Sequence, residues 1–297
     1  MIRSFKKKNK IAGLLFISPW LIGFLILIFF PVITSLVWSF CDYDLLSSPE
    51  PAGLTNYTQL SQDPRFYKAL TNTLVYAVCA VPLGICVSML LALLLNQKVR
   101  GIAVYRTLFY LPSIVPVVAS SILWIWLFDP TQGLINYLLK GFGISGINWL
   151  QSPFWSKPAL VIMSLWGSGN FMLIYLAALQ EIPETLYEAA AIDGAGRWQR
   201  IRYITVPSLT PVIFFNLIMG LIESFQYFSQ VYVVTNGQGG PLDSTLFFSL
   251  YLFQSAFHYL EMGYASAMAW VLFLLIFGLT IIFLKTSKHW VHYTGRL

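Results

Sequence analysis

The chain has 297 residues, of which 57% are hydrophobic and only 10% are charged. Soluble domains carry about 25% charged residues, so this composition excludes a soluble globular protein and indicates an integral membrane protein. The net charge of +6 does not indicate a nucleic-acid-binding protein, because the basic residues lie in short segments between apolar runs.

Six apolar runs are long enough to cross a bilayer, for which a helix needs about 20 mostly apolar residues. They cover residues 12–39, 71–95, 105–127, 158–179, 207–232 and 263–285. The first run is longer than the core of a secretory signal, and no small-residue cleavage site follows it, so we expect a retained membrane anchor. The sequence therefore predicts an all-α polytopic membrane protein with a basic N-terminus (1–10), a six-helix membrane domain (11–285) and a short tail (286–297).

The distribution of basic residues predicts the orientation of these helices. Four segments hold most of the 18 lysines and arginines, namely Arg3, Lys6, Lys7, Lys8 and Lys10; Lys98, Arg100 and Arg106; Arg197, Arg200 and Arg202; and Lys285, Lys288 and Arg296. Cytoplasmic segments of membrane proteins are enriched in lysine and arginine. We therefore expect both termini and the segment 181–206 to face the cytoplasm.

The outer connections are longer and carry turn signals. The stretch Asn236–Pro241 is rich in glycine and predicts a turn before the last apolar run. The three cysteines, Cys41, Cys79 and Cys86, form no disulfide framework. Cys79 and Cys86 lie about 10 Å apart along one helix, which is too far for a disulfide.

The longest polar interruption of the membrane domain is the segment 181–206. Pro183 suits the first turn of a helix, and the alanines that follow it are strong helix formers with little bulk. Gly194 and Gly196 supply the backbone freedom to stop and turn, and the apolar residues Trp198, Ile201 and Ile204 then recur at roughly helical spacing before Pro207 opens the next apolar run. The segment therefore predicts two short helices that meet at an angle, with an alanine face that another protein can approach closely.

The residues of this segment resemble the cytoplasmic EAA loop of permease subunits of binding-protein-dependent ABC importers, in the sugar-importer branch. The matching residues are Glu188, Ala189, Ala190, Asp193, Gly194, Ile204 and Pro207. The turn before the last apolar run also resembles the sugar-permease pattern. Ile201 and Val206 depart from the residues usual in that branch, although both remain apolar.

The resemblance implies a type I importer permease fold and a contact with ATPase subunits through the seven matching residues. It also implies two ATPase subunits, a second permease subunit that we expect to be a different protein, and an extracytoplasmic solute-binding protein. The cargo would be a carbohydrate or polyol, and the location the plasma (inner) membrane of a prokaryote. Because the chain lacks GxxxxGK[ST], we expect ATP and Mg²⁺ to bind the partner ATPases, with no cofactor, metal or catalytic site on this chain.

A carboxylate interrupts the fifth apolar run at Glu223. Such a group costs a few kcal/mol within a membrane and usually faces a cavity or a partner. Helical spacing places five residues on one face of the run, namely Asn216, Gly220, Glu223, Tyr227 and Gln230. This stripe predicts a substrate path through Asn216, Glu223, Tyr227 and Gln230; the alternative is that Glu223 bonds to another helix or faces the partner permease.

Two other classes of protein stay open at this level. An ATP-independent secondary transporter or channel would need more paired ionisable residues in the membrane than the sequence offers. An intramembrane enzyme would need a cluster of His, Asp or Ser residues at membrane depth, and the sequence suggests no such cluster.

Overall fold

The computed structural model describes residues 2–97 and 99–292, with the backbone alone for residues 2–12. The predicted basic side chains of the N-terminus, and those of Lys98 and Arg296, therefore lie outside the described part. The chain divides into two compact units. Unit 1 holds the chain up to Asp63 together with Leu252–Val271, and unit 2 holds Pro64–Tyr251 together with the chain from Leu272 onward.

The described chain is built almost entirely of helices, which confirms the all-α class. Its elements are α1 (Ile2–Phe24), η1 (Leu25–Phe29), α2 (Phe30–Trp38), β1 (Cys41–Asp42), β2 (Glu50–Pro51), α3 (Thr55–Gln62), α4 (Pro64–Leu95), α5 (Ile102–Tyr110), η2 (Leu111–Ile114), α6 (Val117–Leu127), α7 (Leu134–Gly141), α8 (Ser156–Trp166), α9 (Gly169–Gln180), α10 (Glu184–Ile192), α11 (Arg197–Arg200), η3 (Ile201–Thr205), α12 (Val206–Phe225), α13 (Ser229–Thr235), η4 (Pro241–Asp243), α14 (Phe248–Phe253), η5 (Gln254–His258) and α15 (Met262–Ser287). The strands β1 and β2 pair antiparallel, with Cys41 opposite Pro51.

Four helical stretches of the described chain are each long and apolar enough to cross a membrane: Gly13–Trp38, Pro64–Leu95, Arg197–Thr235 and Met262–Ser287. The third and fourth predicted runs are each broken instead. Ile102–Ile114 and Val117–Leu127 meet at 97°, and Ser156–Trp166 and Gly169–Gln180 meet at 47°. The predicted six spans are recovered when each bent pair is counted as one span.

Proline causes the sharper of the two breaks. Val115 has an extended backbone (φ −65°, ψ 129°) and precedes Pro116. The proline ring clashes with a helical conformation of the residue before it, and proline has no N–H to continue the helix. The break therefore follows from the local sequence, whereas the angle between α5–η2 and α6 depends on packing.

Unit 1 is organised around the connection from α2 to α3. The Asn56 amide donates hydrogen bonds to the carbonyl oxygens of Ser39 and Cys41, at 3.0 and 2.8 Å. The Tyr264 hydroxyl donates to the Asp63 carboxylate at 2.7 Å. Cys41, Cys79 and Cys86 are all free, so the prediction that they form no disulfide is confirmed.

The core of unit 2 forms where α4 packs against α9 and α12. Its fully buried members include Ala92 of α4, Met172 and Tyr175 of α9, and Leu209 of α12. The small Ala92 side chain lets the helices approach closely, as is usual between membrane helices. This core holds α4, α9 and α12 together, and all three line the cavity described below.

The start of α9 requires a glycine because another segment approaches it closely. A Cβ atom at Gly169 would lie 2.9 Å from the Phe109 carbonyl oxygen and 2.9 Å from the Ser113 hydroxyl. We expect Gly169→Ala to lower the free energy of unfolding by about 1–3 kcal/mol, because backbone must shift to admit the methyl group. Thermal unfolding of the detergent-solubilised protein measures the change.

Gly278→Ala in α15 is the matched control for Gly169→Ala. No atom of the described chain lies within 4 Å of a Cβ built at Gly278, so the same change causes no clash with it. We expect it to alter the free energy of unfolding by at most about 1 kcal/mol, in the stabilising direction. Equal losses of stability in the two variants would contradict the close approach at Gly169.

A polar network in unit 2 holds the turn after α13 against α4 and α8. Positive φ angles at Asn236, Gly237, Gly239 and Gly240 confirm the turn predicted over Asn236–Pro241. The buried amide of Asn72 donates to the carbonyl oxygens of Asp243 and Leu246 at 2.7 and 3.0 Å. Its oxygen accepts a hydrogen bond from the Lys157 ammonium at 3.0 Å.

We expect Asn72→Leu to lower the free energy of unfolding by about 2–4 kcal/mol, because it leaves buried carbonyl oxygens and an ammonium group without their partner. Asp243→Asn is the comparison. The ion pair of Arg65 with Asp243, at 3.1 Å, is partly exposed, so its loss should cost less than about 1 kcal/mol. Thermal unfolding that ranks the two variants in the opposite order would contradict the role given to Asn72.

Candidate functional site

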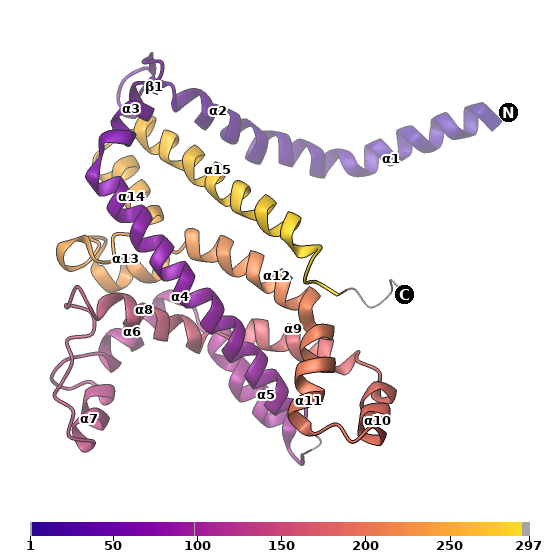
Figure 1. The fold of residues 1–297 in the computed structure, drawn as a ribbon. Helices are drawn as coiled ribbons and strands as arrows, with labels where there is room; N and C mark the ends of the chain where they lie inside the picture. Colours follow the sequence, from indigo (N-terminus) through magenta and orange to yellow (C-terminus); the bar gives the residue numbers. More distant parts are fainter. Residues whose placement is uncertain (1, 98, 293–297) are drawn as a thin grey trace. The chain divides into compact units, whose positions relative to one another are not determined.

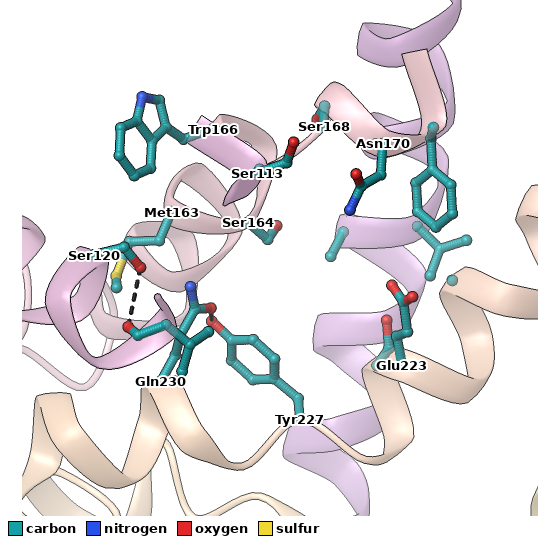
Figure 2. A pocket seen from close by; sticks show the side chains of 18 of the residues that line it. Ser113, Ser120, Met163, Ser164, Trp166, Ser168, Asn170, Glu223, Tyr227 and Gln230 are labelled. Atoms are coloured by element: carbon teal, nitrogen blue, oxygen red, sulfur yellow. Dashed lines mark hydrogen bonds between the residues drawn. The ribbon is translucent and has the colours of Figure 1, made fainter. Parts of the chain in front are cut away.

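Unit 2 contains a cavity of about 480 Å³. Its walls come from α4, the bend between η2 and α6, the bend between α8 and α9, and the region where α12 gives way to α13 (Figure 2). Cavities of about 300–1,000 Å³ suit small-molecule ligands. The two bends that broke the predicted spans thus form part of the wall.

The five residues of the predicted stripe all line this cavity: Asn216, Gly220, Glu223, Tyr227 and Gln230. The prediction assumed one unbroken helix, and that assumption was wrong, because α12 ends at Phe225 and α13 begins at Ser229. Tyr227 lies in the connection, and its hydroxyl donates a hydrogen bond to the Gln230 side chain (Figure 2). The residues are brought together as predicted, while their role in a substrate path stays a prediction.

Asn216 is the unusual member of the stripe. Its side chain is fully buried, at 0% exposure. Neither its Nδ2 nor its Oδ1 atom has a hydrogen-bond partner among the described residues. Buried amides in proteins are nearly always paired, because an unpaired one costs about 1–3 kcal/mol. An unpaired amide in the cavity wall is therefore a candidate to bind a polar ligand once a movement of the wall exposes it.

Sequence reasoning missed the groups that other helices contribute. The Tyr76 ring of α4 stacks on the Tyr227 ring, with 4.6 Å between centroids and 22° between planes. Asn170 of α9 and the hydroxyls of Ser113, Ser120, Ser164 and Ser168 also line the cavity (Figure 2). Serines are common in membrane helices and often bond their own backbone, so the sequence held no signal that sets these apart.

Glu223 is the only side chain with a formal charge at neutral pH among the described residues that line the cavity. Its carboxylate forms no ion pair with a described residue, so the predicted alternative of pairing with another helix of this chain finds no support there. Figure 2 shows the side chain rising from α12 toward the side of the cavity where Asn170 lies.

The segment 181–206 lies at one end of unit 2 (Figure 1). Helix α10 ends at Ile192, and Gly194 follows with a φ of +76°. The amide of Ala195 donates to the Ala190 carbonyl oxygen at 2.8 Å, which closes the end of α10. A hydrogen bond of 2.9 Å between the hydroxyls of Tyr187 and Thr205 ties α10 to η3.

Two details of the predicted segment were wrong. Pro183 precedes α10 and does not lie in its first turn. The second helix is not a separate short one, because α11 continues through η3 into α12 as far as Phe225. Proline lacks an N–H and clashes with the carbonyl of the preceding turn. Pro207 lies in the first turn of α12, and the wider π-helical turn of η3 directly before it, over Ile201–Thr205, makes room for the proline ring.

The seven residues predicted to contact the ATPases fall into two groups. Glu188, Ala189, Asp193 and Gly194 are exposed, and Ala190, Ile204 and Pro207 are half-buried. Two large apolar side chains outside the predicted set are also open to solvent: Ile192 is 88% exposed and Trp198 is 82% exposed. Their position within a polar segment was the signal that could have found them.

Comparison with known proteins decides the family. The family model described as "Binding-protein-dependent transport system inner membrane component" matches residues 80–287, more than half of the chain. The chain belongs to this family. The assignment confirms the resemblance of the EAA-like segment, and it makes the permease a membrane transport component and not an intramembrane enzyme.

Individual relatives cover nearly the whole permease. The probable ABC transporter permease protein YesP of Bacillus subtilis (strain 168) is 46% identical, over 99% of this chain and 96% of the relative. The lactose transport system permease protein LacF of Rhizobium radiobacter is 37% identical, over 92% of this chain and 93% of the relative.

A solved structure shares the fold of the permease. It is a chain of a bacterial ABC transporter involved in the import of the acidic polysaccharide alginate. The TM-score is 0.81 at 24% identity, with 96% of this chain and 98% of that chain covered. This likeness confirms the ABC importer permease fold that the resemblance implied.

Proposed function

We propose that the chain is the permease subunit of an ATP-driven importer that carries a carbohydrate or polyol across the plasma (inner) membrane of a prokaryote. An extracytoplasmic solute-binding protein delivers the cargo, and both termini lie in the cytoplasm. Two ATPase subunits hold ATP and Mg²⁺, and a second permease subunit, different from this one, completes the pathway through the lipid bilayer.

The exposed apolar side chains of the segment 181–206 are the observation that carries this proposal. Ile192 of α10 and Trp198 of α11 are both almost fully exposed to solvent. Burying one large apolar side chain contributes about 1.5–3 kcal/mol. A segment with two such side chains, outside the apolar runs, is suited to dock on a soluble protein. The exposed Glu188 would then pair with a cation of the ATPase.

The continuity of α11, η3 and α12 supports a mechanical link between docking and transport. The path from Arg197 to Glu223 is helical throughout, and at 1.5 Å per residue it spans about 39 Å. A continuous helix transmits a displacement, whereas a loose connection would absorb it. Movement of the docked end therefore moves Asn216 and Glu223 in the cavity wall.

The chemistry of the cavity supports an uncharged, hydroxyl-rich cargo. Amide groups of Asn170, Asn216 and Gln230 supply both donors and acceptors, and the stacked rings of Tyr76 and Tyr227 offer an apolar surface. Ligand sites combine a few placed polar groups with apolar and aromatic walls in this way. The relative named for lactose transport agrees with a carbohydrate cargo.

Co-expression with the proteins encoded beside the gene tests the proposal. We expect an ATPase to co-purify with the chain, and its hydrolysis rate in proteoliposomes to rise when the binding protein and lactose are added. Uptake without ATP would replace the proposal with a secondary transporter or channel.

Trp198→Ala probes the docking surface directly. We expect at least a tenfold loss of co-purified ATPase, since removing about 1.5–3 kcal/mol of binding energy lowers affinity by that order. Phe142→Ala is the matched control, because Phe142 is 84% exposed and lies outside the segment. Equal ATPase recovery in both variants would remove Trp198 from the docking surface.

A further inference from the structure

We propose that Glu223 selects the charge class of the imported solute, so that the cavity admits neutral and cationic solutes and rejects those that carry a phosphate, sulfonate or carboxylate group. This inference rests on the proposed function, because it takes the cavity as the import path. The fold alone does not decide the charge of the cargo, since the alginate transporter of similar fold is described as importing an acidic polysaccharide.

The basic side chains near the membrane helices of unit 2 do not offset Glu223. Arg65 pairs with Asp243, Lys157 donates to Asn72 and to the Ser244 carbonyl oxygen, and Arg106 donates to the Leu95 carbonyl oxygen. None of these three is among the described residues that line the cavity. The carboxylate therefore stands in the cavity without a counter-charge from the described chain.

Helix ends at the cavity wall do not offset the carboxylate either. The wall contains the starts of α6, α9 and α13, whose N-terminal ends carry partial positive charge of about half a unit. It also contains the ends of η2, α8 and α12, whose C-terminal ends carry partial negative charge. Each of the three breaks thus brings one positive and one negative helix end to the cavity, and their partial charges cancel. The Glu223 carboxylate is then the net charge of the cavity wall.

The expected size of the selection follows from Coulomb's law. At an effective dielectric constant of about 20, a unit charge about 8 Å away changes the local population of a charged solute roughly thirtyfold. The effect raises the population of a cation and lowers that of an anion. A neutral sugar is unaffected and still finds the amides and hydroxyls of the wall.

Thiol-modification rates test the selection without requiring knowledge of the natural cargo. The full chain is expressed with its partners in a background where Cys41, Cys79 and Cys86 are replaced by alanine. Ser164→Cys places a reporter thiol in the cavity wall, and Asn170→Cys places a second one on α9. Permeabilised membranes are treated with a cationic probe, the trimethylammonioethyl methanethiosulfonate, and with the matched anionic probe, the sulfonatoethyl methanethiosulfonate.

The measured quantity is the ratio of the cationic to the anionic modification rate, divided by the same ratio for 2-mercaptoethanol. Because both probes attack the same thiolate, this ratio is independent of the reactivity of the thiol. We expect a value of at least about ten at either reporter. Glu223→Gln should reduce this ratio to about one. Glu223→Asp keeps the charge and should retain the high ratio. Glu50→Gln alters an exposed carboxylate in β2 of unit 1 and should also retain it.

A ratio near one with Glu223 present, or a high ratio that survives Glu223→Gln, would overturn the charge selection. So would failure of both probes to reach either reporter, because the cavity would then be closed to charged solutes of both signs. The assay is also separable from the proposed function. A high ratio in a protein without ATP-driven uptake would reject the import path but retain the electrostatic effect of Glu223. Normal ATP-driven uptake with a ratio near one would reject the charge selection alone.

Discussion

Gly194→Val is expected to reduce ATP-driven uptake by more than about tenfold while the chain still inserts and folds. Gly194 has a φ of +76°, and no atom of the described chain lies within 4 Å of a Cβ built there. The substitution therefore causes no clash within this chain. A residue with a side chain is less stable in this conformation by about 1–2 kcal/mol, and a β-branched one by more. The turn relieves the strain by changing the angle between α10 and α11, which displaces the exposed docking residues.

The measurements for Gly194→Val are ATPase co-purification, sugar-stimulated hydrolysis and uptake in proteoliposomes. Gly143→Val is the matched control, because Gly143 has a φ of +77°, has equally open surroundings and lies outside the segment 181–206. Both variants should lose a similar amount of stability, and only Gly194→Val should lose the coupling of ATP hydrolysis to sugar uptake. Coupled uptake at the normal rate in Gly194→Val, or an equal loss in both variants, would contradict the role of this turn.

Asn216→Leu is expected to raise the free energy of unfolding by about 1–2 kcal/mol and to reduce uptake by more than about tenfold. The wild-type protein buries the Asn216 amide without a hydrogen-bond partner among the described residues, and removing such a group recovers the free energy of its desolvation. Bound sugar would lose the donor and acceptor that this amide offers, and each hydrogen bond to a buried neutral group contributes about 0.5–1.5 kcal/mol. Leucine also takes up part of the cavity, which adds to the loss of uptake.

The same substitution at Asn72 is the control for Asn216→Leu. Both asparagines are buried, but Asn72 has three hydrogen-bond partners and Asn216 has none of the described residues as a partner. Thermal unfolding in detergent should therefore show stabilisation at one site and destabilisation at the other. Destabilisation of both variants would make Asn216 a structural residue, and unchanged uptake in Asn216→Leu would remove it from the substrate path.

The two expected results describe the ends of one mechanical unit. Gly194 sets the angle at which the exposed end of the segment is presented, and Asn216 lies further along the same helical path. A variant at either end should impair transport by a different route. Gly194→Val should change hydrolysis and its coupling, whereas Asn216→Leu should leave ATPase binding intact and weaken the response to sugar.

The sequence by itself determined the features that depend on neighbours in the chain. Long apolar runs separated by basic segments identified a membrane protein, because a bilayer requires continuous apolar helices. The residues Glu188–Pro207 carried the family resemblance, and Gly194 does adopt the positive φ that its place after the alanines predicted. The spacing of Asn216 and Glu223 placed them on one face of α12, because helical periodicity is local.

Only the tertiary structure decided the features that depend on residues far apart in the chain. Pro116 marks a break locally, but packing sets the 97° bend that turns a predicted span into part of a cavity wall. Tyr76 meets Tyr227 across about 150 residues of chain, and the missing partners of Asn216 become evident only when α4, α9 and α12 are packed together. Periodicity states which face a side chain occupies, whereas the neighbour it meets there is set by how the helices pack.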